Sequence, residues 1–314
     1  MASILDSVNQ LTELVGQNRL ELLLFRLPGN NQIFGINVFK VKEVLQCPKL
    51  TLMPKLHKFV RGVAHVRGQT ISVIDLGLAT GGKMIHDFDH SYVIIAEYNR
   101  SVQGFLVGGV ERIVNLDWSK VLPPPKGMGK VNYLTAVTEV DKQLVEILDV
   151  EKILDEISPV KTDVSEEILD NVKQEIEQKQ AADTSRPPLK VMVADDSSVA
   201  RNQVKRALKT IGLEAVLVNN GQEAFNKLHE LLQNGPIYDQ IGLLISDIEM
   251  PEMDGYTLTA KIRQDSDLCN LKIILHTSLS GVFNQAMVKK VGADNFIAKF
   301  NPDDLAHAVK ELMP

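Results

Sequence analysis

Cysteine is almost absent from this sequence. Its 314 residues include only Cys47 and Cys269, which lie too far apart along the chain to form the paired spacing of a zinc site. Two isolated cysteines also cannot build the disulfide framework that stabilises small secreted domains. We therefore expect a protein of the reducing cytoplasm, stabilised by hydrophobic cores.

Long apolar runs and an excess of positive charge are lacking as well. No stretch approaches the roughly 20 apolar residues of a membrane-spanning helix. The N-terminal sequence MASILDSVNQL has no basic start followed by a long apolar run, so it does not read as a signal peptide. The formal net charge of -6 removes the broad attraction to phosphate backbones on which nucleic-acid binding depends. These absences predict no direct membrane insertion and no nucleic-acid partner.

The apolar patterns indicate two domains joined by a linker. Residues 1–18 carry a helical apolar stripe, which predicts a helix that covers part of a core or binds a partner. Short apolar segments such as TISVIDL and SYVIIAEY, separated by glycine and proline, predict an all-β domain over residues 19–160. Residues 161–188 are expected to be a linker that contains a helix. Its apolar residues recur at every fourth position: Val164, Ile168, Val172 and Ile176.

Residues 189–314 alternate strand and helix patterns five times, which predicts a doubly wound parallel sheet. In such sheets ligands gather at the carboxyl ends of the strands. Polar and charged residues stand at four of these predicted ends: Asp195, Asp196, Asp247, Thr277 and Lys299. The start of the last helix is also marked, by Asn301 as its cap, Pro302 at its first position, and Asp303 and Asp304 in its first turn.

The clustered acids indicate a particular chemistry. Three carboxylates at one edge would repel unless a cation intervened, and an oxygen-only ligand set suits Mg²⁺. An ionised Asp247 could then attack a phosphoryl group, while Lys299 and Thr277 stabilise the phosphoryl oxygens. Adjacent aspartates at a strand end could instead face solvent or cap the next helix. The run DIEMPEMDG that starts at Asp247 favours the chemical interpretation.

This half of the chain resembles the response-regulator receiver family, a flavodoxin-like α/β fold. The resemblance makes Asp247 the phosphoacceptor and Lys299 the phosphate-sensing residue, with Thr277 and Phe296 as switch residues. It assigns Mg²⁺ ligation to Asp195, Asp196, Asp247 and the backbone carbonyl of Glu249.

The N-terminal half carries no constellation that indicates catalysis, such as a G-x-S-x-G turn or a Gly-rich phosphate loop, so no enzyme activity is expected of it. Its segments FGINVFKVKEVLQ and FVRGVAHVRGQTISVIDL resemble the CheW coupling-protein family. That resemblance implies two five-stranded β-barrels that bridge chemoreceptor tips to the histidine kinase CheA. It also assigns partner contacts to Val41, Glu43, Gly62, Arg67 and Gly68. Without the motif, the arginine could be an ordinary surface residue, the glycines turn residues and the valine a core residue.

A coupling domain fused to a receiver is the arrangement of the CheV family, which the whole chain resembles. The resemblance implies a non-enzymatic, cytoplasmic adaptor at membrane receptor arrays, with a CheA-type kinase and methyl-accepting chemoreceptor tips as partners. Mg²⁺-dependent phosphorylation of Asp247 would regulate its coupling. One alternative is a phosphate sink that drains phosphoryl groups from the kinase. A regulator with a catalytic or DNA-binding output is disfavoured by the missing motifs and the acidic charge.

Overall fold

A computed structural model describes residues 19–29, 31–98, 101–124, 133–159, 164–181, 188–277, 290–299 and 301–313. The helix predicted within residues 1–18 lies outside these ranges. The described chain contains two compact units, which divide between Pro159 and Val160. Among the described residues, no helix is both long and apolar enough to cross a membrane.

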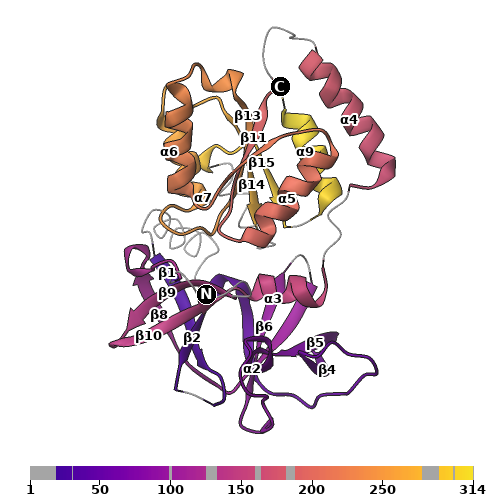
Figure 1. Cartoon of the computed structure of the whole chain (residues 1–314), viewed down its shortest axis with the longest axis vertical. Helices are drawn as coiled ribbons and strands as arrows, with labels where there is room; N and C mark the ends of the chain where they lie inside the picture. The colour runs from indigo at the N-terminus through magenta and orange to yellow at the C-terminus, as the bar shows by residue number, and fades with distance from the viewer. Residues whose placement is uncertain are drawn as a thin grey trace, which may run out of the picture. The chain divides into compact units, whose positions relative to one another are not determined.

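The first unit is built from two five-stranded sheets (Figure 1). One sheet has the order β8-β1-β2-β10-β9, formed by β1 (Arg19–Arg26), β2 (Ile33–Asn37), β8 (Gly109–Asp117), β9 (Leu134–Val140) and β10 (Gln143–Leu148). The other has the order β3-β6-β7-β5-β4, formed by β3 (Val41–Gln46), β4 (Val60–Val66), β5 (Gln69–Asp75), β6 (Tyr92–Tyr98) and β7 (Ser101–Val107). Short helices complete the unit: η1 (Val38–Lys40), α2 (Leu76–Ala79), η2 (Trp118–Lys120) and α3 (Val150–Ile157).

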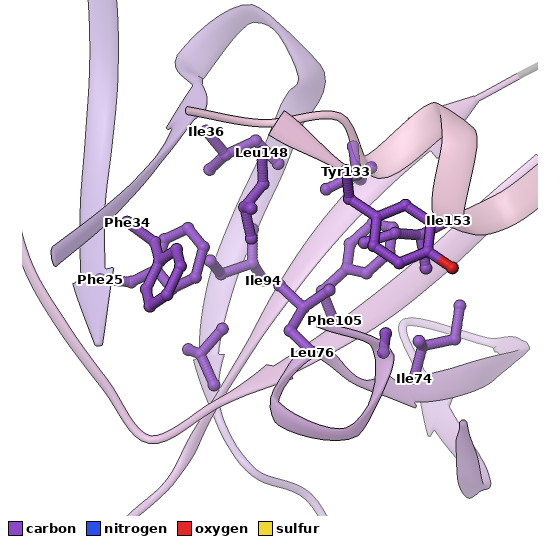
Figure 2. Packing of buried hydrophobic residues seen from close by; sticks show 14 of the residues in the cluster. Phe25, Phe34, Ile36, Ile74, Leu76, Ile94, Phe105, Tyr133, Leu148 and Ile153 are labelled. Carbon is purple, nitrogen blue, oxygen red and sulfur yellow. The ribbon is translucent and has the colours of Figure 1, made fainter. Parts of the chain in front are cut away.

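A shared hydrophobic core joins these two sheets. Figure 2 shows Phe25 and Phe34 of the first sheet packed toward Ile94 and Phe105 of the second, with Ile153 of α3 alongside. The rings of Phe25 and Phe34 stack with their centroids 5.9 Å apart. Strand β1 can serve two cores because its successive side chains point to opposite faces and both faces are apolar. The predicted β-rich fold of this half is confirmed.

The second unit is a parallel sheet of five strands in the order β12-β11-β13-β14-β15. The strands are β11 (Lys190–Ala194), β12 (Ala215–Val218), β13 (Ile241–Asp247), β14 (Lys272–Thr277) and β15 (Asn295–Ala298). Its helices are α4 (Glu166–Ala181), α5 (Ser198–Thr210), α6 (Gly221–Leu232), η3 (Ile237–Asp239), α7 (Gly255–Gln264) and α9 (Pro302–Leu312). Side chains of α6 and α7 share one core cluster, and those of α4, α5 and α9 share another. The predicted doubly wound parallel sheet is confirmed.

Helix α9 begins as its sequence predicts. The Asn301 side chain caps the helix by accepting hydrogen bonds from the backbone N–H groups of Asp303 and Asp304. Pro302 stands at the first helical position, where its missing N–H costs nothing. This cap ties the loop after β15 to the start of α9.

Helix α4 forms within the segment predicted as a linker, and it packs with the second unit. Val164, Val172 and Ile176 are buried in the cluster that contains α5 and α9 residues, and Ile168 packs against that cluster. Figure 1 shows α4 alongside α9. The four-residue spacing thus marks the face of α4 that covers the second unit.

Candidate phosphoacceptor site

The parallel sheet brings the predicted acids together at its carboxyl edge. Asp195 follows β11 directly and Asp247 is the last residue of β13, a neighbouring strand. Asp195, Asp196 and Asp247 each offer one carboxylate oxygen, and these oxygens all lie within 4.8 Å of one another. Asp195 and Asp247 are buried, and Asp196 is half-buried. Such a group of oxygens can hold a divalent cation.

Lys299 lies among the same carboxylates. Its Nζ donates a hydrogen bond of 2.7 Å to Asp247 Oδ2 and lies 2.7 Å from Asp195 Oδ2. The backbone of Lys299 is fixed beside β14, because the Lys299 N–H donates to the Thr277 carbonyl at 2.8 Å. Lys299 is only 3% exposed and Thr277 is fully buried.

Local backbone contacts orient the two central aspartates. Asp195 Oδ1 accepts from the Ser197 N–H at 2.8 Å, and Ser197 in turn caps α5. Asp247 Oδ1 accepts from the Ile248 N–H at 2.7 Å. A Cβ atom at Gly255 would lie 2.2 Å from the Asp247 carbonyl oxygen, so only glycine fits there. The glycine that ends the DIEMPEMDG run therefore lets α7 approach the strand that carries Asp247.

Burial and nearby carboxylates disfavour the ionised form of Asp247. Burial raises the pKa of Asp247 well above its ordinary value; the Lys299 ammonium opposes this shift, while the carboxylates of Asp195, Asp196 and Glu249 add to it. With every carboxyl ionised, the site would carry more negative charge than one lysine compensates. A hard cation such as Mg²⁺ would relieve the repulsion, and carboxylate oxygens are the ligands it prefers, so the residues present fit this ion.

The remaining receiver residues predicted from sequence lie near the site without joining the carboxylate cluster. Glu249 is half-buried, two positions after Asp247. Phe296 lies on β15 and packs against the cluster that includes α6 and α7. Its neighbour across the ladder is Leu275 of β14. The roles of these two residues stay predictions.

In the first unit the structure brings two of the five predicted contact residues together. The exposed Arg67 guanidinium donates to both carboxylate oxygens of Glu43, with Nε 2.9 Å from each and Nη2 2.7 Å from Oε2. Arg67 and Gly68 form the two-residue turn between β4 and β5, with positive φ at both positions, as a tight hairpin requires. The sequence offered no sign of the pairing, because the residues are 24 positions apart.

Gly62 and Val41 have structural reasons for their identity. Gly62 has a φ of +150°, and a Cβ there would lie 2.7 Å from the Thr51 carbonyl oxygen. Val41 packs against the core shared by the two sheets. The core interpretation of Val41 therefore holds, whereas Gly62 lies within β4 at a shift in the strand register and not in a turn.

Comparison with known proteins assigns each unit to a family. The CheW-like domain matches residues 21–158 and the response regulator receiver domain matches residues 191–310. Chemotaxis protein CheV1 of Helicobacter pylori is 28% identical over 332 aligned residues, covering 100% of this chain and 99% of the relative. CheV3 of the same organism is 29% identical, and the alignment covers 94% of this chain and 95% of CheV3. Chemotaxis protein CheY1 of Helicobacter pylori is 34% identical, and the alignment covers 40% of this chain and 97% of CheY1.

Proposed function

Because the chain belongs to the CheV family, with a CheW-like domain followed by a receiver domain, we propose that it is a chemotaxis adaptor switched by phosphorylation of Asp247. The observation that carries this proposal is the buried Asp195–Lys299–Asp247 cluster at the carboxyl edge of the parallel sheet. A buried nucleophilic carboxylate beside a buried ammonium suits the attack on, and then the retention of, an anionic group.

The chain's own residues define the transfer step. A carboxylate oxygen of Asp247 attacks the phosphorus of the donor, a phosphohistidine of a CheA-type kinase. A new P–O bond forms as the P–N bond breaks, and its electron pair stays on the imidazole nitrogen. The Lys299 ammonium, 2.7 Å from Asp247 Oδ2, and the Thr277 hydroxyl stabilise the phosphoryl oxygens. Asp247 thereby becomes an acyl phosphate.

Mg²⁺ is the cofactor that this site would hold. Asp195, Asp196 and Asp247 would bind it through carboxylate oxygens, with the backbone carbonyl of Glu249 as a further ligand. When bound, the ion neutralises the carboxylates and the incoming phosphoryl oxygens, which would otherwise repel each other.

The CheW-like unit supplies the docking function. We place its contacts with the kinase and with chemoreceptor tips around the exposed Arg67–Glu43 pair at the β4–β5 turn. An arginine held by two hydrogen bonds to a carboxylate presents a rigid charged surface that a partner can recognise. The predicted contact set remains Val41, Glu43, Gly62, Arg67 and Gly68. Recruitment to membrane receptor arrays would follow from these contacts.

The test is co-sedimentation of the full chain with receptor-containing membranes and a CheA-type kinase, with kinase activity measured before and after phosphorylation in Mg²⁺. An adaptor docks and changes kinase activity when Asp247 is phosphorylated. Asp247→Ala should dock normally but lose the response, and Asp267→Ala, which removes an exposed carboxylate, should behave like the parent chain. Phosphoryl groups drained from the kinase with no change in coupling would instead indicate a phosphate sink.

The same assay tests the docking surface. Arg67→Glu places two acidic side chains next to each other and should weaken co-sedimentation. Arg112→Glu is the matched control, because Arg112 is another exposed arginine of this unit paired with an acid, Asp141. Equal losses in the two variants would contradict a specific contact at Arg67.

A further inference from the structure

Helix α4, in the segment that joins the two domains, packs on the receiver, and the residue before it contacts Asp303, four positions after Lys299. We propose that α4 is a docked segment of the receiver that is released when Asp247 carries a phosphoryl group. The proposal rests on the proposed phosphorylation of Asp247 and adds the means by which it reaches the rest of the chain.

The docking of α4 rests on buried apolar contacts. Val172 is 0% exposed and Ile176 is 2% exposed, within a cluster shared with α5 and α9. On the rim of this contact, Lys310 of α9 donates to Asn171 Oδ1 at 2.8 Å and pairs with Glu175 at 2.9 Å. Apolar contacts surrounded by polar ones are typical of a surface that binds a helix specifically.

The helix depends on this docking for its order. It spans Glu166–Ala181, and isolated helices of about 15 residues are marginal in water. Its sequence EEILDNVKQEIEQKQA is otherwise polar, so its few apolar side chains have no other core among the described residues of this unit. An event that weakens the contact with α9 would therefore free the helix.

One short segment connects this docked helix to the phosphoacceptor site. The backbone N–H of Ser165, just before α4, donates to Asp303 Oδ1 at 2.8 Å. Asp303 lies in the first turn of α9, which Asn301 caps. Lys299, two positions before this cap, contacts Asp247. Lys299 and Asp303, four positions apart, thus contact Asp247 and the residue that precedes α4.

A phosphoryl group on Asp247 would shift this segment. The Lys299 ammonium now lies against the carboxylates of Asp195 and Asp247, and it would follow the new negative charge outward onto the phosphoryl oxygens. A displacement on the order of 1 Å is enough to break a hydrogen bond of 2.8 Å such as that between Ser165 and Asp303. The direction of the effect is therefore release of α4.

Release would lengthen the tether between the coupling unit and the receiver. With α4 docked, Val164 and Ser165 are held on the receiver, so the tether that follows α3 comprises six residues, 158–163, which could span at most about 22 Å. With α4 released, the tether comprises 32 residues, 158–189, which could span at most about 115 Å. A longer tether lowers the effective concentration of one domain at a partner held by the other. Phosphorylation could change coupling in this way without altering the CheW-like unit.

Amide hydrogen exchange of the full chain tests the proposal, with beryllofluoride and Mg²⁺ as the probe that imitates the phosphoryl group. We expect the amides of residues 166–181 to exchange about fivefold faster or more when the probe is bound. Val172→Asp should give fast exchange with or without the probe, because it places a charge in the buried contact. Gln174→Asp adds the same charge on an exposed position of α4 and should behave like the parent chain.

Reciprocity supplies a second measurement that does not depend on α4 alone. If the probe releases α4, then freeing α4 must strengthen binding of the probe by the same factor. Val172→Asp and Asp303→Ala, which removes the acceptor for Ser165, should therefore bind beryllofluoride about fivefold more tightly or better. Gln174→Asp should bind it with unchanged affinity.

The outcomes separate this inference from the proposed function. Probe binding with unchanged exchange in α4, and equal affinities in all variants, would overturn the release of α4 while leaving phosphorylation of Asp247 standing. A parent chain that binds no beryllofluoride in Mg²⁺ and accepts no phosphoryl group would overturn both.

Discussion

Replacing Lys299 with methionine tests the electrostatic description of the site. Lys299 is buried with its ammonium 2.7 Å from two buried carboxylates, those of Asp195 and Asp247. Methionine keeps much of the apolar stem, so the change removes mainly the charge. Removing one partner of a buried ion pair costs about 3–5 kcal/mol, because the other charge stays behind in the interior. We expect Lys299→Met to lose stability in that range at pH 7 in the absence of Mg²⁺.

The pH dependence of this loss has a definite sign. Burial already raises the pKa of Asp247, and removing Lys299 takes away the one neighbour that lowers it. A carboxyl with a raised pKa in the folded state weakens stability above that pKa, and the penalty disappears as the pH falls and the group is protonated. The deficit of Lys299→Met should therefore be largest at pH 8 and should shrink steadily toward pH 5.

A double-mutant cycle isolates the interaction. Asp247→Asn alone should stabilise the receiver at pH 7, by about 1 kcal/mol, because it removes a charge that is costly to bury. In the Lys299→Met background, Asp247→Asn should raise the free energy of unfolding by more than it does in the parent chain. The difference between the two gains, which is the interaction energy, should be about 2 kcal/mol. Mg²⁺ should also stabilise Lys299→Met more than the parent chain, since it supplies the missing positive charge.

Chemical denaturation followed by circular dichroism measures these differences in unfolding free energy. The single tryptophan, Trp118, lies in the CheW-like unit, so its fluorescence transition is an internal control that should not move. Lys272→Met is the matched variant, because Lys272 pairs with Asp294 at an exposed position, where such pairs contribute about 1 kcal/mol or less. A loss below about 1 kcal/mol for Lys299→Met, or a loss equal at pH 5 and pH 8, would refute this reasoning.

Two further substitutions test the fold around each unit. Gly255→Ala should destabilise the receiver by about 1–3 kcal/mol and slow phosphorylation, since the added Cβ would lie 2.2 Å from the Asp247 carbonyl oxygen. Normal phosphorylation kinetics in this variant would show that the backbone moves aside at little cost. Phe105→Ala empties a fully buried position between the two sheets and should cost about 3–5 kcal/mol, seen as an earlier Trp118 fluorescence transition. The receiver transition should stay in place, and a joint shift of both transitions would argue against independent units.

Local pattern was enough to predict much of the receiver and its candidate site. Alternating strand and helix periods imply a parallel sheet, and the carboxyl ends of parallel strands must share one edge. The sequence therefore predicted that Asp195, Asp247 and Lys299 lie at the same edge of the sheet. The start of α9 at Asn301 was predictable for the same reason, because a helix cap is determined by a few consecutive residues.

Contacts between distant segments were not predictable in this way. The pairing of Glu43 with Arg67 depends on how β3 lies relative to the β4–β5 turn, and neither residue type requires the other. The spacing of Val172 and Ile176 predicted that α4 has an apolar face, but periodicity does not say which surface covers that face. A linker helix and a docked helix have the same pattern.

The sequence by itself determined which residues form each element, which faces are apolar and which side chains end the strands. These properties depend on backbone geometry and on neighbours a few positions away. Only the tertiary structure decided that α4 covers the receiver, that Ser165 contacts Asp303 and that Lys299 lies between two buried carboxylates. Such contacts arise from the shape and charge of whole surfaces, and a surface exists only once the chain has folded.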